Sequence, residues 1–211
     1  MDHMPVCHVF GAGEFSGPVP VVDSRDIVIA ADGGFTILKQ LGLVADYIIG
    51  DFDSLPEIPP HKNIVRLPEQ KDITDMRAAL ALGLEKGFRE FSIYGGTGGR
   101  FEHTLANLQC IAWLSQNDAR GYLRDERKTV TAITNGSIFF GRETRGYISI
   151  FAHTDIAKGV FLVGLKYPLT DATVTNIFPI GVSNEFTGID SSVTVHDGTI
   201  IVVYPPGIKP L

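Results

Sequence analysis

The sequence predicts an α/β fold in two parts: a mainly parallel, helix-covered sheet over residues 1–125, then a small all-β sandwich over residues 126–211. Two observations lead to this division. In the first part, short apolar runs alternate with segments of helical periodicity, whereas after about Asp125 strand-like runs follow one another without a convincing helix between them. A chain of 211 residues can bury a sizeable core, as one large domain or two small ones.

Five apolar runs predict the strands of the first part, and most of them end in glycine or aspartate. In sheets of this kind ligands bind beyond the carboxyl ends of the strands. Those ends read GAGE, ADGG, GDFD and GGTGG, so we expect the chemistry of the protein there. The runs are 7–14, 26–34, 46–53, 62–68 and 90–96.

Two segments between these runs have helical spacing. In 72–87, apolar residues recur at Ile73, Met76, Leu80 and Leu84, with Asp72 expected as the N-cap and Gly87 as the stop. In 101–118 the same spacing is expected to give a helix with one buried face. That face comprises Phe101, Leu105, Leu108 and Ala112.

The second part reads as strands throughout. Asp197-Gly198 stands between two β-branched runs, which predicts a hairpin turn. Together with the strand-rich pattern, this favours a small sandwich. The strand-like runs are 129–136, 147–153, 160–167, 172–178 and 191–204.

Composition excludes several classes of protein. The net charge of −6 argues against a nucleic acid or an anionic membrane as the main partner. No apolar run approaches the roughly 20 residues of a membrane span, and the N-terminus lacks the pattern of a signal peptide. Cys7 and Cys110 are far apart among apolar residues, which is typical of free thiols in a reducing compartment. We therefore expect a cytoplasmic protein.

Asp51 and Asp53 form an acidic pair at the end of a predicted strand. If the strand stays extended, both side chains project to the same side, where they repel each other unless something compensates their charge. Mg²⁺ fits such a place, because it takes one or two carboxylates together with substrate phosphate oxygens. The alternative is a solvated turn in which Asp53 and Ser54 cap the backbone before Pro56.

A second acidic pair, Asp72 and Asp75, opens the helix that follows Lys71. Both acids would be favourable at a helix N-terminus for purely structural reasons. Yet Asp75 is also expected at the same sheet edge as the first pair, and Lys71 could neutralise a phosphate there. Three acids and a lysine at one edge favour a metal–phosphate site.

The stretch from Tyr94 to Leu108 places four glycines around Thr97, between a strand and a helix. Glycines let backbone N–H groups approach an anion at a helix N-terminus, and Arg100 offers a fixed cationic fork for phosphate. No Walker A motif is present. The alternative is a glycine-rich turn in which Arg100 pairs with Glu102, with His103 as a structural histidine. Asp32-Gly33 is, by itself, only a strand-end turn.

Taken in order and at these distances, ADGG, GDFDS, KDITD and GGTGGRFEHTLANL resemble the thiamine pyrophosphokinase family. GLKYPL and GVSNEF extend the resemblance through the second part, so it spans nearly the whole chain. It implies a Rossmann-like ATP- and Mg²⁺-binding domain, a thiamine-binding and dimerisation sandwich, and a homodimer with sites near the subunit interface. The implied reaction transfers the pyrophosphoryl group of ATP to the hydroxyl of thiamine, which gives thiamine diphosphate and AMP.

The resemblance also implies roles for individual residues. Asp51, Asp53 and Asp75 would hold Mg²⁺, and Lys71 or Asp72 would orient or deprotonate the thiamine hydroxyl. The ATP-binding set would be Asp32, Gly33, Thr97, Gly98, Arg100, Glu102 and His103, and the thiamine-binding set Tyr167, Ser183 and Asn184. Glu102 departs from the family, which usually has Asp there; the longer side chain keeps the charge but puts a nucleotide contact at this position in question.

Two other functions fit the same residues. A Mg²⁺-dependent phosphohydrolase or nucleotidyltransferase would use the same acids on another phosphate substrate, and would not require thiamine to release AMP. A non-catalytic nucleotide-binding module would bind ATP without forming AMP. A purely structural protein is the weakest alternative, because it gives no reason for so many acids and glycines at strand ends.

Overall fold

A computed structural model describes residues 4–52, 60–68, 70 and 72–211. Its chain divides into two compact units. The first comprises Met1–Cys110 with Gly121–Glu126, and the second comprises Ile111–Arg120 with Arg127–Leu211. None of the described helices is both long enough and apolar enough to cross a membrane.

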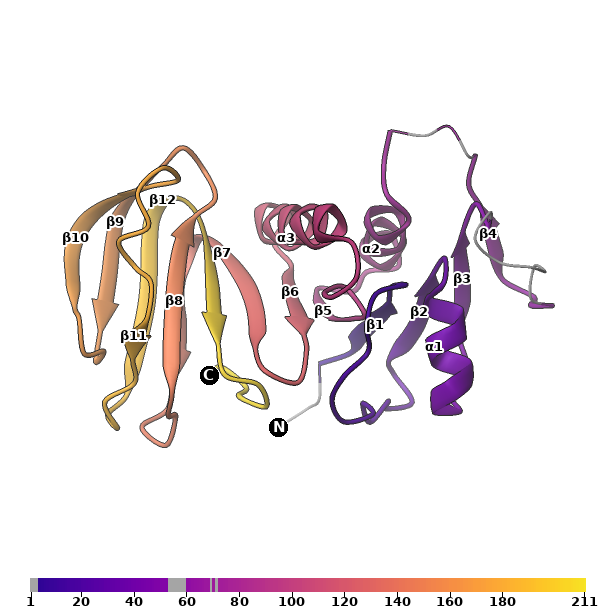
Figure 1. Cartoon of the computed structure of the whole chain (residues 1–211), viewed down its shortest axis with the longest axis horizontal. Helices are drawn as coiled ribbons and strands as arrows, with labels where there is room; N and C mark the ends of the chain where they lie inside the picture. The colour runs from indigo at the N-terminus through magenta and orange to yellow at the C-terminus, as the bar shows by residue number, and fades with distance from the viewer. Residues whose placement is uncertain (1–3, 53–59, 69, 71) are drawn as a thin grey trace. The chain divides into compact units, whose positions relative to one another are not determined.

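The first unit is built on a parallel ladder (Figure 1). Its strands lie in the order β5-β1-β2-β3-β4, and every neighbouring pair among them is parallel. All five predicted strands are therefore present, although each is shorter than its apolar run because the glycines and acids fall outside. The strands are β1 (Val6–Phe10), β2 (Ile27–Ala31), β3 (Tyr47–Gly50), β4 (Ile64–Arg66) and β5 (Glu90–Tyr94).

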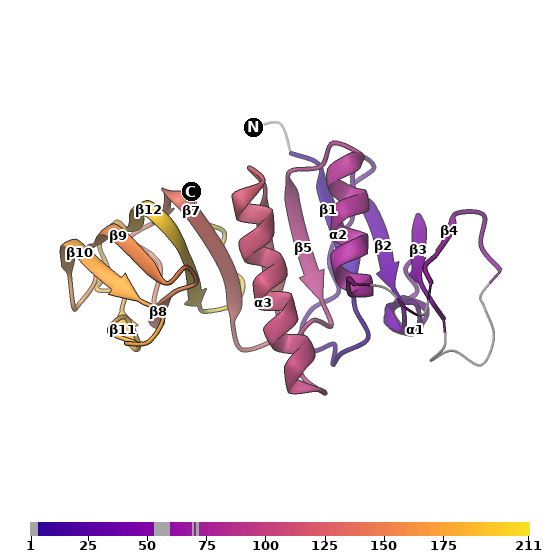
Figure 2. The same ribbon diagram turned by 90° about the horizontal axis from the view of Figure 1, so that it is seen from above.

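Two helices cover opposite faces of this ladder, because successive strand residues point to opposite sides. Helix α1 (Gly34–Leu41) buries Leu38 against the face that carries Phe10 and Val28. Helix α2 (Asp75–Glu85) packs on the other face, where Gly83 lies so close to Cys7 and Phe91 that a Cβ would clash with both. Figure 2 shows α2 in front of the strands of this ladder. Helix α1 was not predicted.

The N-cap of α2 is Thr74, and the prediction of Asp72 was wrong. The Thr74 side chain accepts a hydrogen bond from Arg77 N at 3.2 Å, while Asp72 is exposed and precedes the helix. Both residues are acceptable caps, so the choice depends on where the chain enters the helix. At the other end Gly87, with φ of 91°, ends the helix as predicted.

Helix α3 (Phe101–Gln116) is present, and its buried face agrees with the predicted one only in part, because Ala112 is fully buried as predicted. Phe101 and Leu105 are 71% and 47% exposed. Residues displaced around the helix are buried instead, among them Asn107, Cys110 and Leu114. A polar residue therefore occupies a core position, and the apolar periodicity misled the assignment of the face.

The chain does not stay extended after β3, so the argument that Asp51 and Asp53 project to one side does not hold. Phe52 has φ of 63°, in the left-handed region, and its side chain is buried in the core cluster beside α1. Burial of this ring turns the chain at once after Asp51. Asp53 lies outside the described residues.

The second unit consists mainly of antiparallel strands around one apolar core. The long strand β12 (Ser191–Tyr204) pairs with β7 (Thr129–Phe140) along one edge. Along its other edge, its first half pairs with β9 (Ile156–Val163) and its second half with β8 (Tyr147–Ala152). The remaining strands are β10 (Leu169–Thr175), paired with β9, and β11 (Asn184–Glu185), paired with β8.

The predicted hairpin at Asp197-Gly198 was wrong, because β12 continues through it. Three residues of β12, 196–198, stand opposite the single residue Asn135 of β7, which is a bulge in the ladder. Gly198 has φ of 115°, and its N–H donates to Asn135 Oδ1 at 2.9 Å. The dipeptide thus serves a bulge, which needs the same backbone freedom as a turn.

Parallel and antiparallel pairs occur in different parts of the chain, so the fold as a whole is mixed α/β. One strand of the first part, β6 (Arg120–Arg124), was missed. It follows α3 directly, and its Arg124 Nε donates to Ser92 Oγ of β5 at 3.1 Å.

Candidate functional site

The loops that follow β1 and β5 are joined by backbone hydrogen bonds. Gly11 N donates to Tyr94 O at 2.8 Å, Gly13 N to Gly95 O at 2.8 Å, and Glu14 N to Thr97 O at 3.1 Å. A Cβ on Gly13 would lie 2.6 Å from Gly95 O, so a side chain there would force the two loops apart. These glycines therefore allow two strand ends to form one continuous floor.

This floor belongs to a cavity of about 430 Å³ at the carboxyl ends of the strands, where the sequence predicted the chemistry. It lies entirely within the first unit. The strand-end loops supply one side, and the first turns of α2 and α3 supply the other. The lining residues are Gly11, Ala12, Gly13, Ala31, Asp32, Thr74, Asp75, Met76, Gly95, Gly96, Gly98, Gly99, Arg100, His103, Ala106 and Asn107.

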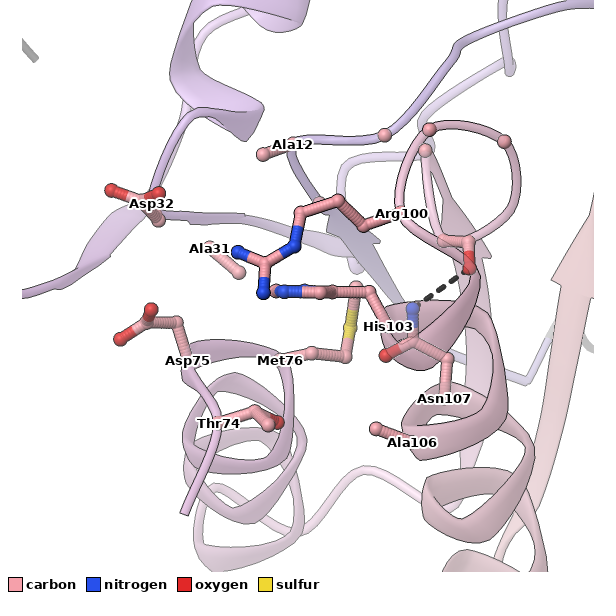
Figure 3. A pocket seen from close by; sticks show the side chains of 16 residues that line it. Ala12, Ala31, Asp32, Thr74, Asp75, Met76, Arg100, His103, Ala106 and Asn107 are labelled. Carbon is pink, nitrogen blue, oxygen red and sulfur yellow. Dashed lines mark hydrogen bonds between the residues drawn. The ribbon is translucent and has the colours of Figure 1, made fainter. Parts of the chain in front are cut away.

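Opposite charges meet in this cavity (Figure 3). Asp32 follows β2 and has φ of 47°, a conformation that aspartate tolerates better than most residues. Asp75 lies in the first turn of α2. The guanidinium of Arg100 and the ring of His103 extend toward these carboxylates from the start of α3. This arrangement suits a polyanion such as a phosphate chain. A divalent cation could link it to the carboxylates on one side, and the arginine guanidinium could bind its oxygens on the other.

Arg100 also forms the pair that the alternative interpretation predicted. Its Nε donates to Glu102 Oε1 at 2.7 Å, and both side chains are more than half exposed. The backbone N–H of Glu102 and the Arg100 side chain hold the pKa of this carboxyl below its usual value, so it is ionised at neutral pH. An exposed pair of this kind contributes little stability, and a phosphate could replace the carboxylate on Arg100.

Asn107 lines the cavity although the sequence analysis did not single it out. Its Nδ2 donates to Gly96 O at 2.8 Å, and the residue is buried (Figure 3). It therefore fixes the glycine loop to α3. The sequence feature that could have identified Asn107 is a polar residue within the apolar periodicity of the helix.

We expect Asn107→Ala to destabilise the fold by about 1–3 kcal/mol, because Gly96 O would lose its buried partner. The KM of a ligand that binds in the cavity should rise with it, since the loop would lose its attachment to α3. Thermal unfolding and steady-state kinetics measure the two effects. Asn117→Ala, on the exposed end of the same segment, is the matched control; an equal effect in both variants would contradict the assignment.

Of the other predicted site residues that the structure describes, Asp51, Thr97 and Gly33 do not line this cavity. Asp51 lines a separate hollow with Arg66, Leu67 and Pro68. Thr97 Oγ1 donates to Asp125 Oδ2 at 3.3 Å, and Gly33 is the N-cap of α1 beside Asp32. Lys71, like Asp53, is outside the described residues. Over the part of the chain that is described, no group of three or more His, Cys, Asp or Glu residues is arranged to hold a metal ion.

In the second unit, the three residues of the thiamine set are neighbours. Asn184 is buried, and its side chain accepts from Tyr167 N at 2.9 Å and donates to Tyr167 O at 2.7 Å. Tyr167 is 59% exposed. Ser183 precedes Asn184 with φ of 59°, and its N–H donates to Ser149 Oγ at 3.0 Å. Asn184 thus holds the backbone from which an aromatic ring projects into solvent.

Comparisons with known proteins identify the family. The family model described as "Thiamin pyrophosphokinase, catalytic domain" matches residues 20–123, and "Thiamin pyrophosphokinase, vitamin B1 binding domain" matches residues 138–200. The chain belongs to the thiamine pyrophosphokinase family. The first match includes Asp32, Asp75 and Arg100, and the second includes Tyr167 and Asn184.

Individual relatives agree with this assignment. Thiamine pyrophosphokinase of Bacillus subtilis (strain 168) is 27% identical over 188 residues, which are 86% of this chain and 88% of the relative. Thiamin pyrophosphokinase 1 of Caenorhabditis elegans is 29% identical over 176 residues, 75% of this chain and 71% of the relative. The crystal structure of a Bacillus subtilis thiamine pyrophosphokinase superposes with a TM-score of 0.83 at 25% identity, covering 96% of this chain and 99% of that one. As a thiamine pyrophosphokinase, the chain is a transferase of the ATP:thiamine diphosphotransferase class.

Proposed function

We propose that this enzyme transfers the β,γ-pyrophosphoryl group of ATP to the hydroxyl of thiamine within the cavity of the first unit, with thiamine diphosphate and AMP as products. The observation that carries the proposal is the meeting of Asp32, Asp75 and Arg100 at the carboxyl ends of parallel strands. Attack at a β-phosphorus needs an in-line hydroxyl and neutralisation of the phosphate oxygens, so catalysis is mainly positioning and electrostatics.

The phosphate chain would lie along the glycine loop. Backbone N–H groups around Gly98 and the start of α3 favour an anion there, and Arg100 would exchange Glu102 for a phosphate oxygen. His103 lines the same cavity. Asp32 and Gly33 would contact the nucleotide from the opposite loop, and Thr97 would act through its bond to Asp125. Glu102 would then keep Arg100 in position before ATP arrives rather than contact the nucleotide itself.

The donor set fits Mg²⁺. Asp32 and Asp75 give hard oxygen ligands on one side of the cavity, and an ion that takes one or two carboxylates completes its shell with water and substrate phosphate. We propose Asp75, together with Asp51 and Asp53 from the end of the neighbouring strand β3, as its ligands, with Asp32 close by. Asp51 would have to turn from its own hollow toward the cavity to join Asp75. When bound, the ion would neutralise charge on the phosphate oxygens. Lys71 and Asp72 remain the candidates for orienting the thiamine hydroxyl.

We assign ATP and Mg²⁺ binding to a Rossmann-like domain of residues 1–125, and thiamine binding and dimerisation to a sandwich of residues 126–211. Tyr167 would offer its ring to thiamine, positioned by Asn184, with Ser183 beside it. Exposed apolar residues support pairing of two chains through the second unit. Light scattering of the purified protein tests the homodimer. The exposed apolar residues in 177–182 are Ile177, Phe178, Ile180 and Val182.

We further propose that the enzyme works in the cytoplasm, with neither nucleic acid nor membrane as a partner. Cys7 and Cys110 are free and buried, and burial raises the pKa of both thiols, so they stay protonated and unreactive. Localisation of a fluorescently tagged chain tests the compartment; secretion would contradict it.

The test of the reaction mixes the protein, Mg·ATP and thiamine, and resolves the nucleotides by chromatography. We expect AMP and thiamine diphosphate in equal amounts, and neither product without thiamine. AMP formed in the absence of thiamine would instead indicate a phosphohydrolase, and ADP would indicate transfer of a single phosphoryl group. ATP binding without turnover would indicate a binding module.

A further inference from the structure

A second cavity, of about 340 Å³, lies at the opposite end of the same strands. Met4 and Pro5 line it just before β1 begins, and Glu90 lines it as the first residue of β5. The proposed ATP cavity lies at the carboxyl ends of these strands, so the two cavities are separated by the length of the strands. The proposed transfer reaction uses no residue of this second cavity.

Three cations line this cavity in a chain whose net charge is −6: Arg25, Lys86 and Arg89. They come from two places in the sequence, the turn before β2 and the connection between α2 and β5. Glu90 is the one acidic residue in the described lining. With Asp23, whose carboxylate lies 3.9 Å from the Arg25 guanidinium, three positive side chains and two carboxylates leave a formal charge of +1 around the cavity. The Lys86 ammonium also lies 4.2 Å from the centre of the Tyr47 ring.

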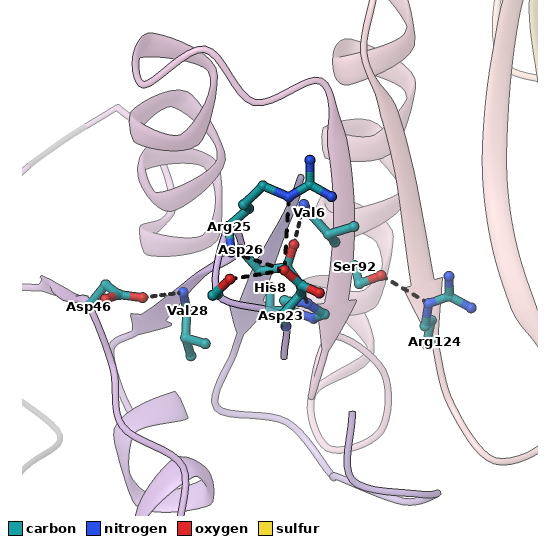
Figure 4. A network of polar contacts seen from close by, with 10 residues as sticks. Val6, His8, Asp23, Arg25, Asp26, Val28, Asp46, Ser92 and Arg124 are labelled. Carbon is teal, nitrogen blue, oxygen red and sulfur yellow. Dashed lines mark hydrogen bonds and ion pairs between the residues drawn. The ribbon is translucent and has the colours of Figure 1, made fainter. Parts of the chain in front are cut away.

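The turn that carries Arg25 is held in place by hydrogen bonds to the carboxylate of the next residue, Asp26 (Figure 4). The carboxylate of Asp26 is buried and accepts from Val6 N at 2.8 Å and from Asp23 N at 2.9 Å, and it meets His8 Nε2 at 3.2 Å. Arg25 N donates to Asp23 Oδ1 at 3.2 Å. The Arg25 guanidinium is only 3.9 Å from the same carboxylate, and both side chains are about half exposed. Such a loose pair leaves the guanidinium able to bind a ligand.

The other two cations lie at the C-terminus of α2, where unsatisfied carbonyls would normally repel an anion. Here three of those carbonyls are already bonded. The backbone N–H of Lys86 donates to Leu82 O, that of Gly87 to Leu84 O, and that of Phe88 to Gly83 O. Arg89 Nη1 adds bonds to Leu84 O at 3.3 Å and Phe88 O at 2.9 Å. The negative pole of the helix is thereby reduced, and the bonds through Nη1 hold the Arg89 fork at the cavity.

The rest of the lining is apolar or backbone: Met4, Pro5, Gly87 and Phe88. A site that combines arginine forks with an apolar wall suits a ligand with an anionic head and an apolar body. A phosphate monoester carries about −1.5 to −2 at pH 7 and offers three strong acceptor oxygens, so it can engage two arginine forks and a lysine at once, which a single carboxylate cannot. We propose that this cavity is a binding site, separate from the ATP site, for a small phosphate monoester with an aromatic or aliphatic body.

Titration of the full ¹⁵N-labelled chain with phenyl phosphate, followed by amide NMR, tests the proposal. We expect saturable shifts at Gly87 and Phe88, separate from any shifts at Gly98 in the ATP cavity. Inorganic phosphate, the second probe, should bind at least tenfold more weakly because it lacks the apolar body. Shifts confined to Gly98 and its loop would overturn the site, and equal affinity for the two probes would overturn the apolar part of the assignment.

The double variant Arg25→Gln with Lys86→Gln should weaken phenyl phosphate at least tenfold at Gly87 and Phe88. Arg89 is kept, because it also satisfies carbonyls of α2. The matched control changes two exposed lysines outside the lining, Lys39→Gln with Lys62→Gln, and removes the same charge. Equal weakening in both double variants would mean that the overall charge, and not this cavity, attracts the probe. Unchanged AMP formation by the test variant shows that it is folded.

Discussion

We expect Asp75→Asn to lower kcat by roughly three orders of magnitude, with little change in stability. Asp75 lines the cavity in which we propose that ATP binds, from the first turn of α2 and opposite Arg100. Asparagine keeps the shape of the side chain but loses the charge that a divalent cation needs, and a metal that stabilises the transferring phosphates supplies several kcal/mol. Steady-state formation of AMP at varied Mg²⁺ measures the loss.

The matched control is Glu85→Gln, at the other end of α2. Each substitution removes one carboxylate from the same helix. Asp75 is also favourable at the positive end of the helix dipole, so its loss should cost about 0.3–1 kcal/mol in thermal unfolding. A variant that keeps near-normal kcat, or that recovers it at high Mg²⁺, would remove Asp75 from the direct metal ligands.

The location of the cavity in the first unit could be predicted because it depends on strand direction alone. Strands that alternate with helices run parallel, and parallel strands bring their carboxyl ends to one edge. Asp32, Asp75 and Arg100 follow or face three of these ends and line one cavity in the structure. No side-chain detail was needed for this inference.

The arrangement around Asp51 could not be predicted, because it depends on the burial of Phe52. The sequence there reads as two acids one residue apart at the end of an extended strand, which implies a shared direction. Core packing of the aromatic ring puts the backbone in the left-handed region instead. A tertiary contact thus overrode the local alternation of a strand.

Other errors have the same origin, since one local pattern can serve two structures. Asp197-Gly198 suits a hairpin or a bulge, and only the partner strand β7 decides between them. Helix α1 was missed because its start is set by a close approach: a Cβ on Gly34 would overlap Phe10 O. In α3, Asn107 is buried because Gly96 O needs a donor. Each outcome depends on a residue distant in sequence.

We expect Arg100→Ala to lower kcat by about 10²- to 10³-fold, the loss typical of one donor removed from a transition-state site. Arg100→Lys should keep the charge but lose the fork, and so recover only part of the rate. The KM for ATP should change less than kcat if Arg100 binds the phosphates mainly as charge develops on them. An unchanged rate in Arg100→Ala would leave Arg100 only its structural pair with Glu102.

Glu102→Gln separates these two roles, because it removes the partner and keeps Arg100. If phosphate replaces Glu102 on the guanidinium, ATP must first break the 2.7 Å bond. The amide is a weaker acceptor, so the KM for ATP should fall or stay within a few-fold of its original value, since an exposed ion pair contributes little. A loss of kcat as large as that of Arg100→Ala would mean that Glu102 positions the guanidinium throughout the reaction. The longer side chain that this family member carries would then be part of its catalytic geometry.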